Sequence, residues 1–332
     1  MDTQLSRDQA LDLALKTLIA SGATEENAKP LADGIIQAEI DGIKSHGFHY
    51  LPIYCLHLSC KKVRGDASPK KNHKSNVALS VDADNGFAHR AILIGFDDLI
   101  PSAKENGIAS LAISNSYNCG VLGYHTKTIA DENLIGIGFT NAPASIAPLG
   151  GIKPVIGTNP FSVAIKSEGN VKILIDQSAS VVAKSEIAVR AKSGESIPIG
   201  WAFGPDGKDT TDPSIALKGT MAPSGGYKGF GVGLFVEIMA ACLTGSNLGI
   251  DASSFADDTG GPPGTGQFFI AINPEKFSNN FDERINNLVK AVESQENARV
   301  PGAKRINNAK INSNSPIIIK EDLYNKILSL QS

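Results

Sequence analysis

The chain has 332 residues, of which 42% are hydrophobic and 20% charged, with a formal net charge of −3 at pH 7. This composition is typical of a globular protein of one large or two ordinary domains with a sizeable core. The mixed charge argues against a nucleic-acid partner, the apolar runs fall short of the roughly 18 residues of a membrane span, and the start lacks a signal-peptide pattern.

The N-terminal sixty residues predict three helices. Ser6 and Gln9 form a capping-box pattern ahead of apolar residues at helical spacing. A second helix is expected after Thr24, with Pro30 inside it, and a third apolar face begins at Leu51. The segment between the second and third helices is therefore a helix junction.

From about residue 76 onward, strands and helices alternate. Strands are predicted at 77–81, 108–114, 134–139, 161–165, 171–175 and 267–272, and helices at 89–104, 120–132, 182–192, 234–243 and 282–294. Residues 225–233 read as a glycine-rich entry to a helix, and 255–266 and 297–317 as polar surface loops. The alternation predicts an α/β fold with a mixed sheet and some parallel pairing.

Ser45 and His46 are adjacent at the helix junction. Histidine titrates near neutral pH, so it is the usual proton donor or acceptor in catalysis. Ser45 is suited to orient the ring, and Gly47 leaves it accessible. From the residues alone, a helix cap beside a structural histidine remains an alternative.

Two loops are candidate phosphate sites. Residues 115–120 connect a predicted strand to a helix N-terminus, whose free amides can hold a phosphate. The stretch Gly225-Gly226-Tyr227-Lys228-Gly229 combines a flexible backbone with a positive charge. Neither a GxGxxG nor a GxxxxGK[ST] motif is present, so each loop also fits an ordinary turn.

No metal site is expected, because the six histidines lack an HExxH motif and the four cysteines lack CxxC spacing. Scattered cysteines favour reduced thiols in the cytoplasm. A hydrolase triad of Ser45, His46 and a distant acid such as Asp176 or Glu186 is an alternative, although no GxSxG elbow is present.

Several short motifs follow one another in a fixed order along the chain. They are Asp41-Gly42, Ser45-His46-Gly47, Ala147-Pro148, Gly157-Thr158-Asn159-Pro160, Gly225-Gly226-Tyr227-Lys228-Gly229, Leu243-Thr244-Gly245 and Arg299-Val300-Pro301-Gly302. Over roughly residues 6–305 this order resembles the malate/L-lactate dehydrogenase family, which lacks the Rossmann fingerprint. Its relatives include sulfolactate and ureidoglycolate dehydrogenases and the reductases of Δ1-piperideine-2-carboxylate and Δ1-pyrroline-2-carboxylate.

The resemblance implies hydride transfer between a nicotinamide and C2 of a small 2-oxo or 2-imino acid. It implies that His46 exchanges the substrate proton, with Ser45 and Glu186 as its relay, and that Thr158 hydrogen-bonds the substrate. Imine reductases usually carry Asp at the position of Glu186. We expect interconversion of a 2-hydroxy acid and its 2-oxo acid, with NADPH-dependent reduction of a cyclic imine as the alternative.

The resemblance also implies NADP as cofactor, with NAD as the alternative, and Arg299 and Lys304 as candidates for the 2′-phosphate. The residues expected to bind the cofactor are Asn118, Cys119, Gly120, Val121, Leu122, Asp176, Gln177, Ser178, Tyr227, Lys228, Arg299 and Gly302. Residues 1–110, completed by 305–332, would form the substrate side and 111–304 the NAD(P)-binding region. A homodimer with its site near the subunit interface is expected.

Tyr50 departs from the family pattern, which commonly has an arginine here to hold the substrate carboxylate. Tyrosine cannot replace that charge, so Lys44, His49 or another cation takes over, or the substrate binds differently. Tyr50 and His49 are still expected to contact the substrate. A nicotinamide-binding protein without turnover is the alternative if anion capture has been lost.

Overall fold

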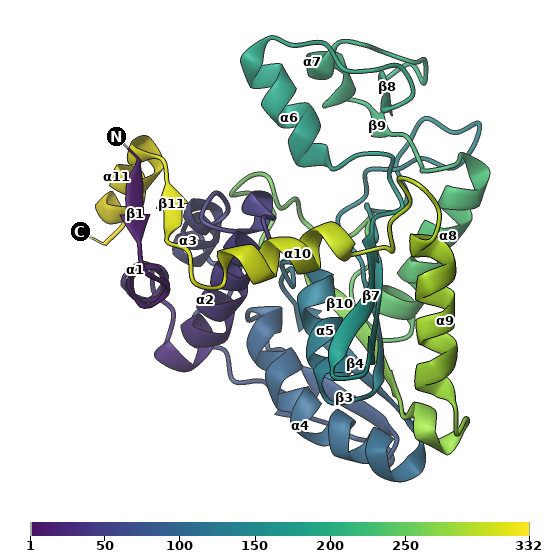
Figure 1. The fold of residues 1–332 in the computed structure, drawn as a ribbon. Helices are drawn as coiled ribbons and strands as arrows, with labels where there is room; N and C mark the ends of the chain where they lie inside the picture. The colour runs from purple at the N-terminus through teal and green to yellow at the C-terminus, as the bar shows by residue number, and fades with distance from the viewer. Residues whose placement is uncertain (1, 332) are drawn as a thin grey trace.

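The computed structural model describes residues 2–331. A lobe of short helices contains both ends of the chain (Figure 1). Its elements are β1 (Thr3–Leu5), α1 (Arg7–Ala20), α2 (Glu25–Ile40), the 3-10 turn η1 (Lys44–His46), α3 (Leu51–Ser59), β11 (Ile317–Ile319) and α11 (Glu321–Ser329). β1 pairs antiparallel with β11, which joins the C-terminal segment to the N-terminal helices.

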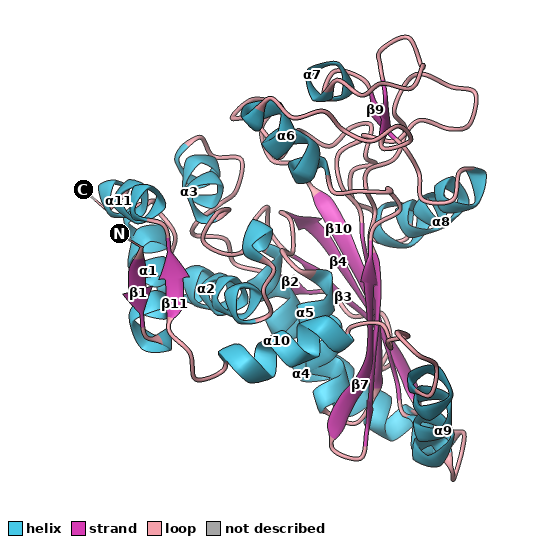
Figure 2. Cartoon of the chain, turned by 45° about the horizontal axis from the view of Figure 1, so that its top comes forward, coloured by secondary structure: helices cyan, strands magenta, loops and turns pink. Residues whose placement is uncertain are grey.

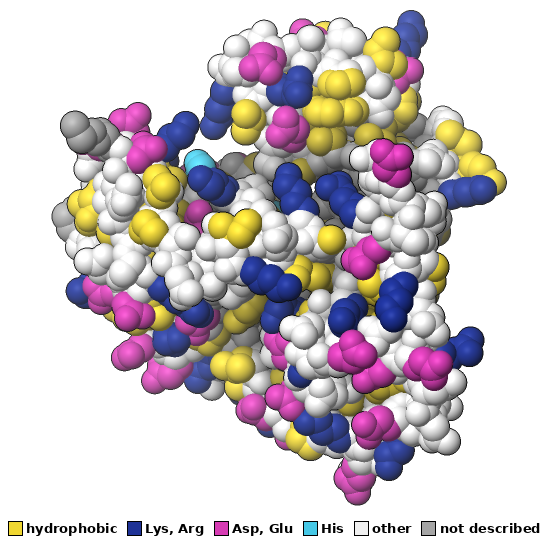
Figure 3. All heavy atoms as spheres, viewed as in Figure 1, with side chains coloured by type: hydrophobic (Ala, Val, Ile, Leu, Met, Phe, Trp, Pro, Cys, Tyr) yellow, Lys and Arg dark blue, Asp and Glu magenta, His cyan; other side chains and the backbone are white. Residues whose placement is uncertain are grey.

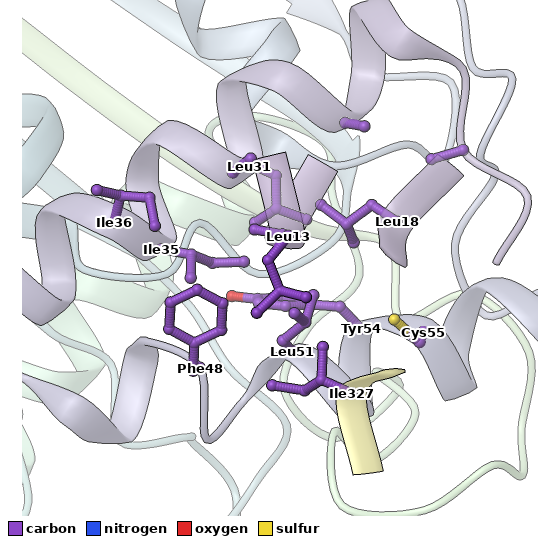
Figure 4. Close-up of a cluster of buried hydrophobic side chains, with 14 of the residues drawn as sticks. Leu13, Leu18, Leu31, Ile35, Ile36, Phe48, Leu51, Tyr54, Cys55 and Ile327 are labelled. Atoms are coloured by element: carbon purple, nitrogen blue, oxygen red, sulfur yellow. The ribbon is translucent and has the colours of Figure 1, made fainter. Parts of the chain in front are cut away.

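The core of this lobe comes from the apolar faces of α1, α2 and α3. Leu31, Leu51 and Tyr54 are fully buried, and Ile327 of α11 packs against them (Figure 4). The predicted capping box is confirmed, because the Ser6 hydroxyl accepts from the Gln9 amide and the Gln9 side chain accepts from the Ser6 amide.

A seven-stranded sheet forms the centre of the molecule (Figure 2). In spatial order its strands are β2 (Lys70–Lys71), β3 (Ala78–Asp82), β4 (Ile108–Ser116), β10 (Thr265–Ile272), β5 (Ile135–Thr140), β6 (Phe161–Ser167) and β7 (Asn170–Gln177). β3 and β4 are parallel, and the other pairs are antiparallel. The predicted α/β fold with a mixed sheet is confirmed.

Helices cover both faces of the sheet (Figures 1 and 2). On one face lie α4 (Ala88–Asn106) and α5 (Leu122–Asp131), and on the other α8 (Tyr227–Glu237), the π-helical turn η2 (Ile238–Cys242) and α9 (Phe281–Glu293). α4 ends at Gly107, as predicted, because its φ of 87° suits glycine. The short 3-10 turn η3 (Pro274–Lys276) precedes α9.

A small segment extends beyond one end of the sheet. It consists of α6 (Lys184–Ser193), β8 (Ala202–Phe203), α7 (Pro213–Ala216) and β9 (Thr220–Met221). Ile146, Ile156, Ile187 and Met221 form its separate apolar cluster.

Two sequence predictions differ from the structure. The glycine-rich stretch 225–233 does not precede a helix but supplies most of α8, which begins at Tyr227. Glycine is needed there for close packing, since a Cβ at Gly229 would stand 1.9 Å from the Ser224 carbonyl oxygen and one at Gly233 2.7 Å from Ile156. The predicted loop 297–317 contains α10 (Ala303–Asn312), a polar helix without an apolar repeat.

α10 crosses from the sheet to the N-terminal lobe (Figure 1). Asn308 and Asn312 donate to the carbonyl oxygens of Asp41 and Ile40 at the end of α2. The chain leading into α10 is fixed to β7, because the Leu174 amide donates to the Pro301 carbonyl oxygen. These contacts stabilise a helix that its own sequence pattern does not indicate.

The proposed division of the chain at residue 110 falls within β4. On its N-terminal side, β3 is a strand of the central sheet and α4 packs against that sheet.

Across residues 2–331, none of the helices has both the length and the apolar character that crossing a membrane requires.

Candidate functional site

The turn η1 presents Ser45 and His46 between α2 and α3, as the sequence predicts. The Ser45 hydroxyl lies 3.0 Å from His46 Nδ1. Within residues 2–331, His46 Nε2 has no hydrogen-bond partner, so it is the nitrogen available to a ligand. Partial burial, and next the Arg305 guanidinium, lower the His46 pKa below its usual 6.5.

The ring of Tyr50 lies next to that of His46. Its ring stacks nearly parallel to His46, with centroids 6.4 Å apart and an interplanar angle of 11°. Its hydroxyl accepts from Asn118 Nδ2 at 3.3 Å. Burial raises the Tyr50 pKa to about 12, so the side chain is neutral and offers no charge to an anion.

The His49 side chain is exposed, whereas that of Tyr50 is partly buried. Partial burial and then the charges of Lys44 and Lys320 lower the His49 pKa. His49 therefore lies near the positive charges of Lys44 and Lys320, which disfavour its own protonation.

The turn between β4 and α5 holds five of the predicted cofactor residues, Asn118, Cys119, Gly120, Val121 and Leu122. Gly120 has a φ of 64°, and its amide donates to Asn118 Oδ1 at 3.1 Å. Tyr54 donates to the same oxygen at 3.2 Å. His125 Nε2 lies 2.9 Å from the Cys119 carbonyl oxygen. Side chains on both sides thus fix the turn.

Arg305 joins the helix junction to the sheet. Its Nε donates to Asp41 at 2.5 Å and its Nη1 to Asp176 at 2.9 Å, and the three side chains are 4–19% exposed. Asp176 also accepts from the Gly123 amide in the first turn of α5 at 2.9 Å. Burial raises the Asp176 pKa, whereas Arg305 lowers it less strongly. No sequence motif pointed to Arg305.

A cavity of about 520 Å³ opens beside this ion pair. Its walls include Asp176, Arg299, Gly302 and Lys304, together with Ile43 of the junction that leads to His46. The structure therefore brings Asp176 to the same cavity as Arg299, Gly302 and Lys304, which follow it by more than 120 residues. Lys and Arg side chains line the hollow between the N-terminal lobe and the α6–α7 segment (Figure 3).

Thr158 lies in a loop whose shape depends on its neighbour Asn159, which has a φ of 35°. Asn159 donates to the buried Glu237 carboxylate at 2.6 Å, and Glu237 accepts from the Gly249 amide at 2.6 Å. The Thr158 carbonyl oxygen accepts from the Ala179 amide at 2.7 Å. These bonds place Thr158 next to the chain that leaves β7.

Gln177 ends β7, and the Ser178 hydroxyl lies 3.0 Å from that of Ser180. Tyr227 instead lines a second cavity of about 560 Å³, with Pro148 and Phe230, and Lys228 beside it is exposed. The structure does not bring Tyr227 and Lys228 to the cavity beside Asp176.

Glu186 lies in the first turn of α6 and pairs with Arg190 at 3.3 Å. Among residues 2–331, no acidic side chain forms a hydrogen bond or ion pair with Ser45 or His46, and Asp176 is paired with Arg305. The relay through Glu186 therefore stays a prediction, and the hydrolase triad is not assembled. Three or more potential metal ligands do not gather anywhere in the described part of the chain.

Comparison with known proteins supplies the family context of this geometry. The profile of a family described as malate/L-lactate dehydrogenase matches residues 5–328. A (2R)-3-sulfolactate dehydrogenase (NADP(+)) of Chromohalobacter salexigens is 39% identical over 305 residues, which cover 92% of this chain and 91% of that protein. A Δ1-pyrroline-2-carboxylate reductase of Ancylobacter novellus is 34% identical, with 98% and 97% covered.

A solved structure, the Δ1-piperideine-2-carboxylate reductase of Pseudomonas syringae, superposes with a TM-score of 0.94 at 30% identity and covers 99% of both chains. The similarity therefore extends over the whole fold, including the N-terminal lobe and the central sheet.

Proposed function

The chain belongs to the malate/L-lactate dehydrogenase family, as its motifs predicted, and we propose that it is an NADP-dependent oxidoreductase that interconverts a small 2-hydroxy acid and its 2-oxo acid. The observation that supports this most is the Ser45–His46 pair, whose turn follows Ile43 in the wall of a cavity that Asp176, Arg299 and Gly302 also line. The similarity to an NADP(+)-linked sulfolactate dehydrogenase supports both the reaction and the cofactor.

The residues around the cavity fit a dinucleotide phosphate. Arg299 and Lys304 supply positive charge, and Gly302, with a φ of 86°, lets the backbone approach β7 where a Cβ would stand 2.6 Å from Leu174. Asn118 and Gly120 would hold the nicotinamide side. When bound, the cofactor supplies the hydride that adds to C2.

His46 would handle the proton at the substrate oxygen. Reduction of the carbonyl builds negative charge on that oxygen, and a protonated His46 donates from Nε2 as the charge develops. Ser45, bound at Nδ1, holds the ring so that Nε2 faces the substrate. Because the His46 pKa is lowered, the neutral ring predominates at pH 7 and acts as base for oxidation of the alcohol.

Thr158 would hydrogen-bond the substrate, as the family resemblance implies. Lys44 and His49 are our candidates for the anion, because Tyr50 is neutral. Glu186 would complete the relay if the α6 segment moves toward Ser45 upon ligand binding.

Reduction of a cyclic 2-imino acid is the second candidate. The TM-score of 0.94 with Δ1-piperideine-2-carboxylate reductase favours it, and the same His46 proton would serve the imine. The test is NADPH oxidation with pyruvate, oxaloacetate, sulfopyruvate and Δ1-piperideine-2-carboxylate, with NADH in parallel. Turnover of a 2-oxo acid supports the main proposal, turnover of the imine alone the second, and turnover of none refutes both.

We also propose a homodimer in the cytoplasm. α8 and η2 expose apolar side chains on the molecular surface, and Val232, Leu234, Phe235 and Ile238 are each 41–50% exposed. A contiguous apolar face of this kind is typical of a subunit interface. All four cysteines are free, which agrees with a reducing compartment.

A further inference from the structure

We propose that Tyr50 is a positioning residue that braces the Asn118–Gly120 turn against the His46 ring. The proposal rests on the proposed function only for the identity of the ligand at that turn. Tyr50 occupies the position where the resemblance implies a substrate contact, so the two roles make opposite predictions.

The amide of Asn118 is held at both ends. Its Nδ2 donates to the Tyr50 hydroxyl at 3.3 Å, and its Oδ1 accepts from the Tyr54 hydroxyl at 3.2 Å and from the Gly120 amide at 3.1 Å. Gly120 has a left-handed backbone, so the shape of this turn depends on that last bond. Two tyrosine hydroxyls therefore set the orientation of the side chain that closes the turn.

The direction of the neighbouring hydrogen bonds follows from His57. Its Nε2 lies 2.9 Å from the Asp257 carbonyl oxygen, which can only accept, so Nε2 carries the proton. His57 Nδ1 therefore accepts from the Tyr117 hydroxyl. The Tyr117 proton is therefore used by His57 and does not compete with Asn118 Nδ2 for the Tyr50 oxygen.

The Tyr50 hydroxyl oxygen thus accepts from Asn118 Nδ2. The Tyr50 ring is equally constrained, since it stacks on His46 and meets the edge of Tyr54 at a centroid distance of 4.8 Å. One side chain thereby sets the spacing between the acid–base group and the cofactor turn.

The substitution Tyr50→Phe separates the two roles, because it keeps the ring stacked on His46 and removes only the hydroxyl. Tyr324→Phe, in α11, is the matched control for loss of a tyrosine hydroxyl away from the turn. The first measurement is hydrogen–deuterium exchange of the peptide that contains residues 117–122, in protein without cofactor. We expect faster exchange in Tyr50→Phe and wild-type exchange in Tyr324→Phe.

The second measurement is the dissociation constant of NADPH, from fluorescence titration, beside the KM of the 2-oxo or 2-imino acid that wild type turns over. We expect the NADPH constant to rise roughly five- to tenfold, as for the loss of one hydrogen bond, with substrate KM changed by less than about twofold. In the Asn118→Ala background, Tyr50→Phe should add nothing to the loss of NADPH affinity.

The opposite pattern would overturn the proposal: unchanged exchange and NADPH affinity with a raised substrate KM would make Tyr50 a substrate ligand. Unchanged values for all three quantities would overturn it as well. If wild type itself does not bind NADPH, the proposed function fails, and the exchange of residues 117–122 alone decides whether Tyr50 braces the turn.

Discussion

Arg305 ties the helix junction at Asp41 to the central sheet at Asp176, so Arg305→Met should be costly. The substitution leaves Asp41 and Asp176, which are 4% and 19% exposed, without their shared cation. Breaking a buried ion pair costs roughly 3–5 kcal/mol. The lower end, about 3 kcal/mol, is expected here because Arg305 and Asp176 keep some contact with water.

Urea unfolding measures this loss. With a slope of about 3 kcal/mol/M, a loss of about 3 kcal/mol lowers the midpoint by about 1 M. Lys304→Met is the control, since Lys304 is exposed and forms no ion pair with another of the described residues. An Arg305→Met midpoint equal to that of the control would refute the assignment of Arg305 as the connection.

The stability lost in Arg305→Met should depend on pH. Burial already raises the Asp176 pKa, and loss of Arg305 raises it further. A carboxyl group with a raised folded-state pKa destabilises the fold above that pKa, and protonation relieves the effect as the pH falls. The difference between wild type and Arg305→Met should therefore shrink between pH 7 and about pH 5. A difference that grows on acidification would show that the carboxylates are not the source of the loss.

Three further predictions concern the pH profile, the first turn of α5 and the apolar face. The His46 pKa is lowered below 6.5, so kcat for reduction should fall as the pH rises through that pKa, and kcat for oxidation should fall as the pH drops through it. A pH profile of kcat whose first inflection lies above pH 7 would contradict this. Gly123→Ala should weaken NADPH binding and lower the urea midpoint, because its Cβ would stand 2.5 Å from the Arg305 guanidinium; wild-type values would remove the close packing from the account. Phe235→Glu should yield monomers in light scattering, whereas Phe277→Glu, at a phenylalanine that is 69% exposed outside α8 and η2, should not; a wild-type monomer would refute the dimer.

Local sequence signals predicted most of the elements. The capping box at Ser6, the helix end at Gly107 and the turn that presents Ser45–His46 depend on neighbours a few residues away, so their pattern is visible in the chain. α10 has no such signal, because its stability comes from Asn308 and Asn312 reaching the end of α2 more than 260 residues earlier.

The contacts that organise the site were hidden for the same reason. Asn118 is 68 residues from Tyr50, and Arg305 is 264 residues from Asp41 and 129 from Asp176. The motifs named candidate site residues, whereas the Tyr50–Asn118 contact and the ion pairs of Arg305 depend on how distant segments pack. Tyr227 lines a different cavity, so the predicted cofactor role of Tyr227 and Lys228 stays a prediction.

The central claim is that His46 passes the substrate proton, and chemical rescue of His46→Ala tests it most directly. Loss of a general acid should lower kcat by about 10²–10⁴-fold while NADPH affinity stays near wild type. Added imidazole, which restores a proton donor of the same chemistry, should then recover part of the rate in proportion to its concentration. Turnover of His46→Ala at the wild-type rate, or a slow variant that imidazole leaves unchanged, would contradict the claim.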